Sequence, residues 1–251
     1  MTYCIAVSVD DGLVLTSDSR TNAGIDNVSI YGKMHIFDTS YDRKLVLLSA
    51  GNLATTQAVI EQMRRDKHEN ATVNINTFQY LSEGADYLGR ISVEKQKQHN
   101  EDAGRSPYNF SATFILAGQL GDEPPGAYLI YPEGNSITTS RQTPYLQIGE
   151  SKYGKPILDR FIKMSTPLDE AGLCSLISMD STIRSNASVG PPVELLVYRK
   201  DSFLFDEYYC FEADDEYLVL LKRRWHDELR NAFIALPHYN RELIKPLERG
   251  L

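Results

Sequence analysis

The order of strand-like and helix-like segments constrains the fold of this chain more than any other feature. Two β-prone segments at residues 2–9 and 12–19 flank Asp10-Asp11-Gly12, a sequence typical of a hairpin turn. A strand pair at 34–37 and 44–49, two helices, four strands, two helices, a hairpin at 193–205 and a last helix complete the pattern. Strands and helices that occur in separate groups indicate antiparallel sheets with helical layers outside them, and argue against a doubly wound βαβ sheet.

The expected helices have recognisable starts. Asn52 can cap a helix that runs to about residue 66, and a second helix covers about 77–97. A third covers about 153–163, and Thr166 followed by Pro167 predicts the N-cap and first position of a fourth. The last helix, about 215–236, carries apolar residues near one face: Leu218, Leu221, Trp225, Leu229 and Phe233. This face either packs within the chain or contacts a second subunit.

Composition excludes several classes of protein. The 251 residues carry 26 Lys+Arg against 34 Asp+Glu, a formal charge of -8, which disfavours nucleic acid or a membrane surface as the partner. No apolar run approaches the ~18–20 residues that span a bilayer, and the first ten residues lack the pattern of a secretory leader. The three distant cysteines fit a reducing cytoplasm. No linker is evident, so we expect one domain over 1–251, with an extension from about residue 200.

Neither a phosphate-binding loop nor a histidine metal site is supported by the sequence. The segment Gly149-Glu150-Ser151-Lys152-Tyr153-Gly154-Lys155-Pro156 nearly matches a phosphate-binding loop, but Pro156 stands where Ser or Thr should ligate Mg²⁺. An ordinary turn between a strand and a helix explains it better. The five histidines have no spacing typical of a metal site. We therefore expect neither a metal nor an organic cofactor.

The most unusual position is Thr2, because removal of Met1 would leave a threonine with a free α-amine. Such an amine has a pKa near 7.7–8.0 and can accept the hydroxyl proton of its own residue at neutral pH. Nucleophile and base then belong to one residue. Many chains begin with Met-Thr, so this feature needs support from the rest of the sequence.

Three further residues could serve that nucleophile. The Lys33 charge would lower the pKa values of the amine and hydroxyl, and Asp18 would hold Lys33 in place. Gly51, just before a helix, could donate its N–H to an oxyanion. Each also has an ordinary interpretation: a turn cap for Asp18, a solvated edge residue for Lys33 and a helix-start glycine for Gly51.

Taken together, the early motifs resemble the proteasome β-subunit family of N-terminal nucleophile hydrolases. The shared residues are Thr2, Gly12, Ser17-Asp18-Ser19-Arg20, Ala23-Gly24, Lys33 and Ser49-Ala50-Gly51. The resemblance is clear over about residues 2–66 and extends by element order to about 199. The sequence SDSRTNAG, the Met-Thr start without a propeptide and the residues beyond about 200 resemble a bacterial, proteasome-related branch of that family.

The resemblance implies an α+β fold, a four-layer αββα sandwich with a C-terminal helical extension. It implies Thr2 as nucleophile, Asp18 and Lys33 as its charge partners, and Gly51 as oxyanion donor. Family members also carry a later Ser–Asp–Ser set, which this chain matches incompletely. Ser151 (or Glu150) stands at the first position and Ser188 fits the last. Ser185 or Asn186 replaces the aspartate.

The function implied is a threonine-type peptidase or amidase in a self-assembling homo-oligomer, a ring or a helical arc, that acts on a peptide-like substrate. Leu53 would suggest a preference for apolar side chains. No motif points to an ATP-dependent unfoldase partner. Two alternatives remain open: a catalytically weak or inactive scaffold, and an amidase for a small amide or isopeptide.

Overall fold

The computed structural model describes residues 2–22, 28–102 and 109–237. The chain divides into two compact units, residues 1–213 and 214–251. The first unit holds both large sheets and the helices that cover them, and the described residues of the second form one helix. The single domain expected over 1–251 stays a prediction.

The first sheet has five antiparallel strands. Its order is β10 (Tyr145–Gly149), β1 (Tyr3–Val9), β2 (Gly12–Asp18), β11 (Val193–Arg199) and β12 (Glu207–Phe211). The pairing of Val9 with Gly12 confirms the first hairpin. The second hairpin differs from expectation, since its return strand is 207–211 and not 203–205. Asp201 and Phe203 have positive φ angles of 61° and 50°, so this stretch turns before the strand begins.

The second sheet also has five antiparallel strands, in simple sequence order. They are β5 (Met34–Ser40), β6 (Arg43–Gly51), β7 (Ala112–Leu120), β8 (Gly126–Ile130) and β9 (Ser136–Thr138). A separate ribbon joins β3 (Arg20–Asn22) to β4 (Val28–Ile30). Sequence patterning did not predict this ribbon, because three residues per strand are too few to show a period.

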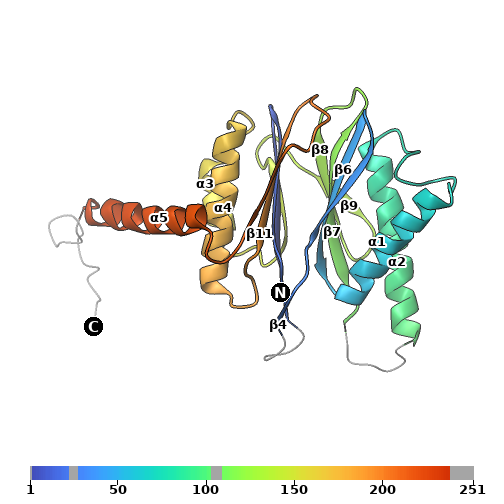
Figure 1. The fold of residues 1–251 in the computed structure, drawn as a ribbon, viewed down its shortest axis with the longest axis horizontal. Helices are drawn as coiled ribbons and strands as arrows, with labels where there is room; N and C mark the ends of the chain where they lie inside the picture. Colours follow the sequence, from blue (N-terminus) through green and yellow to red (C-terminus); the bar gives the residue numbers. More distant parts are fainter. Residues whose placement is uncertain (1, 23–27, 103–108, 238–251) are drawn as a thin grey trace, which may run out of the picture. The chain divides into compact units, whose positions relative to one another are not determined.

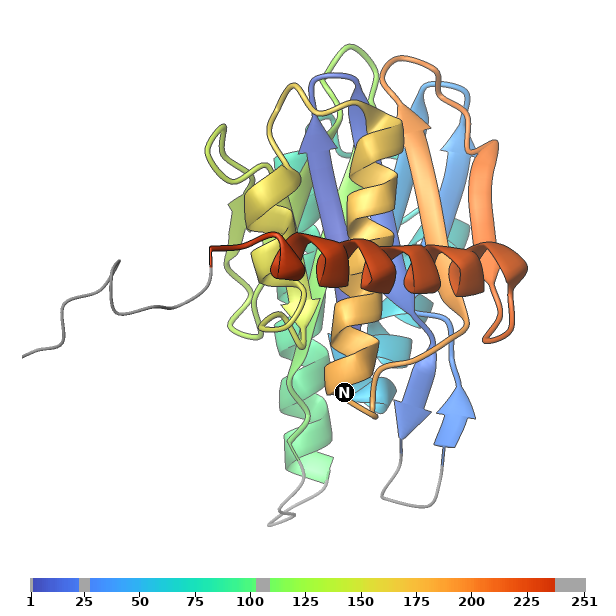
Figure 2. The ribbon, with the colours of Figure 1, turned by 90° about the vertical axis from the view of Figure 1, so that its left-hand side faces the viewer.

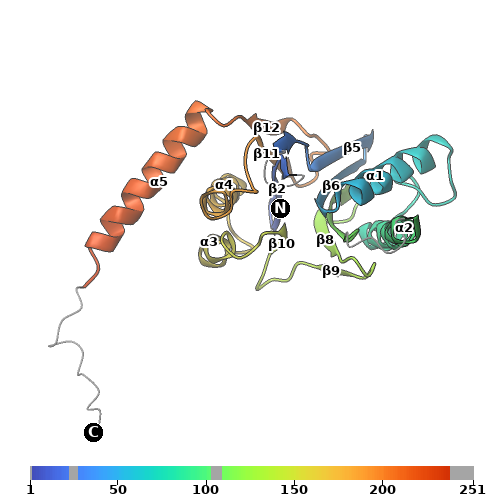
Figure 3. The same ribbon diagram turned by 90° about the horizontal axis from the view of Figure 1, so that it is seen from below.

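The first unit has four layers (Figures 1 and 3). Helices α1 (Leu53–His68) and α2 (Leu81–Asp102) cover the second sheet, while α3 (Lys155–Phe161) and α4 (Leu168–Ser185) lie beside the first. Figure 2 shows α4 lying over the strands of the first sheet. All seven residues of β1 are buried, because Cys4 and Ala6 face the core between the sheets while Tyr3 contacts Ser178 of α4. The predicted αββα sandwich is confirmed.

Helix starts show where local sequence signals succeed and fail. Asn52 caps α1 as expected, its Oδ1 accepting from the Thr55 N–H at 3.1 Å. The predicted Thr166 cap of α4 is wrong: the N-cap is Pro167, with no side-chain bond. The Thr166 hydroxyl instead closes the preceding turn, accepting from the Lys163 N–H at 2.9 Å and donating to the Phe161 carbonyl at 3.2 Å.

The described part of the second unit contains α5 (Glu216–Ile234), whose N-cap Asp215 accepts from the Leu218 N–H at 3.1 Å. Leu218 is buried, but Leu229 and Phe233 are 49% and 75% exposed. Within the described residues, no helix has the length and apolar character needed to cross a membrane.

Candidate active site

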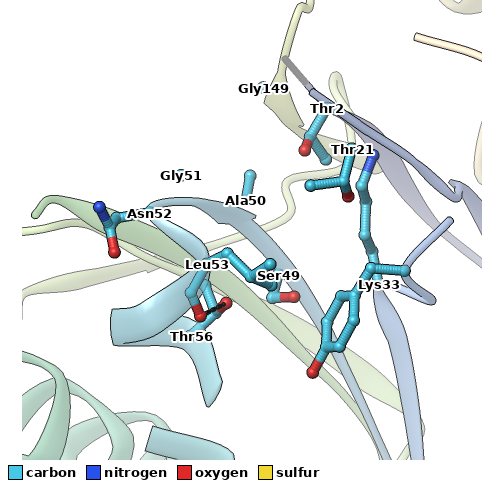
Figure 4. Close-up of a pocket in the computed structure, with 11 residues that line it drawn as sticks. Thr2, Thr21, Lys33, Ser49, Ala50, Gly51, Asn52, Leu53, Thr56 and Gly149 are labelled. Atoms are coloured by element: carbon cyan, nitrogen blue, oxygen red, sulfur yellow. Dashed lines mark hydrogen bonds between the residues drawn. The ribbon is translucent and has the colours of Figure 1, made fainter. Parts of the chain in front are cut away.

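A pocket of about 430 Å³ opens where β1 begins (Figure 4). The end of β6 and the first turn of α1 form one wall, and the starts of β1 and β5 with the end of β10 form the other. The lining residues are Thr2, Thr21, Tyr31, Lys33, Ser49, Ala50, Gly51, Asn52, Leu53, Thr56 and Gly149. Three of the predicted site residues, Thr2, Lys33 and Gly51, therefore share one pocket.

Lys33 and the predicted partner Asp18 form a buried ion pair. The Lys33 Nζ lies 2.6 Å from Asp18 Oδ1, and the two side chains are 5% and 0% exposed. Lys33 Nζ also donates to the Arg20 carbonyl oxygen at 2.6 Å. Figure 4 shows the amino end of Lys33 beside Thr2 and Thr21. The solvated-edge interpretation of Lys33 is therefore wrong.

The Asp18 carboxylate is fully partnered. Besides Lys33, Oδ1 accepts the Tyr3 N–H at 2.9 Å and Oδ2 accepts the Gly190 N–H at 3.1 Å. Burial raises the pKa of Asp18, and the Lys33 charge and these hydrogen bonds oppose that rise. The Asp18 carboxylate thus fixes both the lysine and the backbone of Tyr3, the residue that follows Thr2.

Gly51 lies at the end of β6 with a backbone that requires glycine. Its φ is +107°, and a Cβ there would lie 2.4 Å from the Ser111 carbonyl oxygen. Asn52 follows and caps α1. The structure thus places Gly51 at the pocket wall immediately before a helix N-terminus, where positive dipole charge is available.

Gly149, at the end of β10, allows the backbone of Thr2 to approach closely. Its φ is +82°, and a Cβ would lie 1.9 Å from the Thr2 carbonyl oxygen. The next residue, Glu150, donates its N–H to that same oxygen at 2.7 Å. The segment that resembled a phosphate loop thus connects β10 to α3 and fixes Thr2.

The late Ser–Asp–Ser positions do not line the pocket. Ser151 and Ser188 are partly buried but do not line the pocket, and neither hydroxyl forms a hydrogen bond with the described part of the chain. Ser185 is exposed. Asn186 instead donates from Nδ2 to Glu150 Oε2 at 3.1 Å, and its Oδ1 accepts the Ser188 N–H at 2.9 Å.

Sequence reasoning missed three residues of the pocket, Thr21, Tyr31 and Thr56, and a histidine close to it, His35. Thr21 and Tyr31 line the pocket but lie in or beside the short β3–β4 ribbon, where no pattern was visible. His35 of β5 lies near the pocket residue Ser49, with 3.5 Å between its Nε2 and the Ser49 Oγ. Burial, with a smaller effect of the Arg64 charge, lowers the pKa of His35 to about 4.

Metal ligation receives no support from the described residues, which contain no cluster of three or more His, Cys, Asp or Glu side chains suited to hold an ion. The layered fold, with a threonine at the start of β1 beside a buried Asp–Lys pair, defines the class of proteasome β-subunit-like proteins with an N-terminal nucleophile hydrolase fold.

Comparison with solved structures identifies the family within that class. Anbu (ancestral beta-subunit) from Yersinia bercovieri is 42% identical, with a TM-score of 0.88 over 95% of this chain and 99% of that one. Anbu from Pseudomonas aeruginosa, solved as a helical assembly, is 41% identical, with a TM-score of 0.89 over 95% and 98%. A Gly-1 mutant of Anbu from Hyphomicrobium sp. strain MC1 is 40% identical, with a TM-score of 0.88 over 96% and 100%.

The chain belongs to the Anbu family. This confirms the proteasome-related bacterial branch expected from the sequence. Neither a protein-family model nor a curated protein matches the sequence.

Proposed function

We propose that the chain is a threonine-type peptidase or amidase, with Thr2 as nucleophile after removal of Met1. The observation that carries this proposal is the position of Thr2 at a pocket beside Lys33, whose ammonium is tied to the buried Asp18 carboxylate. Such a cation lowers the pKa values of a neighbouring hydroxyl and amine. It therefore favours the free amine that must act as base.

The reaction needs only groups of this pocket and water. Thr2 Oγ bonds to a substrate carbonyl carbon while its proton passes to the Thr2 α-amine. We assign the Gly51 N–H as donor to the oxyanion that forms. The protonated amine then gives its proton to the leaving nitrogen as the C–N bond breaks, and water hydrolyses the resulting ester and regenerates Thr2.

The proposed substrate is a peptide-like amide. Leu53 and Ala50 supply apolar wall, and Thr21, Ser49 and Thr56 supply hydroxyls. A small amide or isopeptide would use the same nucleophile. Assays with libraries of peptides, small amides and isopeptides would distinguish these substrate classes.

We propose that the protein assembles with copies of itself. Support comes from its 41% identity to the Pseudomonas aeruginosa Anbu that forms a helical assembly. Repeated head-to-tail contacts give a ring or an open arc according to the rotation per subunit. Light scattering is expected to show species much larger than the 28.4 kDa chain, and a monomer at working concentration would contradict this. The three free cysteines support a reducing, cytoplasmic location.

The second candidate function is that of a scaffold with a weak or inactive site. The absence of an aspartate at the end of α4, where Asn186 stands, favours it.

One experiment separates the two functions. Protein made in a host with methionine aminopeptidase is analysed by intact mass before and after treatment with a β-lactone or an epoxyketone. Loss of Met1 with one adduct on Thr2 is expected, and Thr2→Ala should give no adduct while keeping the same melting temperature and assembly. Retained Met1, a free Thr2 that ignores both probes, or an equal adduct on Thr2→Ala would favour the scaffold.

A further inference from the structure

We propose that Glu150, held by Asn186, supplies the carboxylate of the late half of the site and stabilises the protonated α-amine of Thr2. The resemblance placed a serine at the strand end and an aspartate at the end of α4. Here the acid stands at the strand end, and an amide stands on α4. This inference deepens the proposed function and rests on it where it invokes the amine as base.

The backbone makes Glu150 a neighbour of Thr2. Gly149 pairs with Tyr3 at the end of the β1–β10 ladder, and the next residue, Glu150, donates its N–H to the Thr2 carbonyl oxygen at 2.7 Å. Residues opposed in this way have Cα atoms roughly 4.5–5.5 Å apart. The backbone of Glu150 is thus anchored to the residue that carries the proposed nucleophile.

The Glu150 side chain is buried without a full set of partners. It is 5% exposed, accepts one hydrogen bond from Asn186 at 3.1 Å, and lies 3.7 Å from the Nζ of Lys152, a side chain that is 75% exposed. Burying a carboxylate is costly unless charge and hydrogen bonds compensate it. The Thr2 ammonium would provide the nearby positive charge that a mostly solvated Lys152 provides only weakly.

The geometry also explains why residue 186 is an amide. Its Oδ1 is occupied by the Ser188 N–H at 2.9 Å, so its Nδ2 faces Glu150 as a donor. An aspartate here would put a second carboxylate within hydrogen-bond distance of Glu150, and two such charges repel. One acid fits this pair of positions, and the chain carries it on residue 150.

Opposite effects then act on the Thr2 amine. Lys33 favours the free amine, whereas Glu150 favours the ammonium that forms when the Oγ proton is transferred. The other charged groups near this part of the site include Asp18, which is paired with Lys33, Arg20, which donates to the Ala187 carbonyl oxygen, and Lys152. A further buried carboxylate, Glu194, already accepts the hydroxyls of Ser17 and Tyr208 at 3.0 and 2.6 Å. Glu150 is the carboxylate whose own backbone N–H is bonded to Thr2.

Four variants test this role in protein from which Met1 has been removed. They are Glu150→Gln, Asn186→Asp, the double exchange that combines these two substitutions, and the control Glu133→Gln at an exposed loop residue. Competitive labelling with acetic anhydride, read by mass spectrometry of the N-terminal peptide, gives the pKa of the Thr2 amine. The rate of acylation by a β-lactone, measured against pH, gives the second readout. In that reaction Oγ bonds to the lactone carbonyl, the ring C–O bond breaks, and the released alkoxide takes up the proton.

Glu150→Gln is expected to lower the pKa of the Thr2 amine by about one unit, since removal of a neighbouring opposite charge has that size. The rising limb of the acylation profile should move to lower pH with it, and the plateau rate should fall about threefold or more, because a weaker base transfers the proton less well. The double exchange should restore most of both changes, and Glu133→Gln should alter neither. A merely structural role would not move the amine pKa or be rescued by moving the acid.

Unchanged amine pKa and rates in Glu150→Gln would overturn the inference while leaving the proposed function intact. If Glu150→Gln fails to fold, Asn186→Asp decides: the added carboxylate should raise the pKa of the Thr2 amine, and an unchanged amine pKa would overturn the inference. A third outcome separates the two proposals. If the amine pKa shifts in Glu150→Gln but the wild-type protein never forms an adduct, the electrostatic contact is confirmed and the proposed function is contradicted.

Discussion

The two halves of the site differ in how firmly the fold fixes them. The early half comprises Thr2, Asp18, Lys33 and Gly51, and the late half comprises Glu150, Ser151, Asn186 and Ser188. Asp18 receives three donors and Gly51 has a backbone that only glycine fits easily. The late half lies in connecting segments and is joined across the site by one side-chain hydrogen bond. The early half matches the residues that the family resemblance gives, whereas the late half carries Glu150 and Asn186 in place of its serine and aspartate.

The largest effect is expected in the early half, from Lys33→Met. The change leaves the Asp18 carboxylate buried beside Thr2 without its cation, which should cost about 3–5 kcal/mol of unfolding free energy and abolish reaction with a β-lactone. Urea unfolding measures the loss. The double variant Asp18→Asn with Lys33→Met should recover much of the stability but no reactivity. A single variant as stable as the wild type would show that the pair does not hold the early half together.

A glycine exchange compares the two halves directly. Gly51→Ala would put a Cβ 2.4 Å from the Ser111 carbonyl oxygen, and Gly149→Ala would put one 1.9 Å from that of Thr2. Each substitution should lower the free energy of unfolding by about 2–4 kcal/mol, through backbone strain and steric overlap. Gly121→Ala is the control, since its φ of +48° is also strained but no atom lies within 4 Å. Gly121→Ala should lower the free energy of unfolding by only about 1 kcal/mol. Equal losses at all three positions would mean that only φ matters at the two pocket glycines.

Sequence patterns predicted the early half well and the late half poorly, for a physical reason. Hydrophobic periodicity and turn residues located β1, β2, β5 and β6, and these strands carry or border Thr2, Asp18, Lys33 and Gly51. No local pattern records that Asn186 meets Glu150, because 36 residues separate them and the contact depends on how α4 ends against the β10–α3 connection. Thr166 failed as a cap for a local reason, since its hydroxyl closes the preceding turn through Lys163 and Phe161.

The partly buried His35, next to the pocket residue Ser49, should make the stability of the protein depend on pH. Its lowered pKa, about 4 against a usual 6.5, means that folding favours neutral imidazole. Its stabilising effect is therefore complete above pH 6.5 and is lost as the pH falls from there toward 4, by about 2–3 kcal/mol. His35→Gln cannot titrate, so the difference in unfolding free energy between variant and wild type should shrink over this range. Urea unfolding at several pH values checks it, and a difference independent of pH would show that His35 is not buried neutral.

The smallest effects are expected from the serines of the late half. Ser151 and Ser188 are partly buried, and their hydroxyls have no hydrogen-bond partner in the described part of the chain. Replacement of either by alanine should therefore change the unfolding free energy by less than about 0.5 kcal/mol. β-Lactone acylation should also slow less than in Glu150→Gln. This outcome would mean that the late half acts through its carboxylate and not through its hydroxyls. A slower reaction in Ser188→Ala than in Glu150→Gln would instead restore the serine to the role that the family resemblance implied.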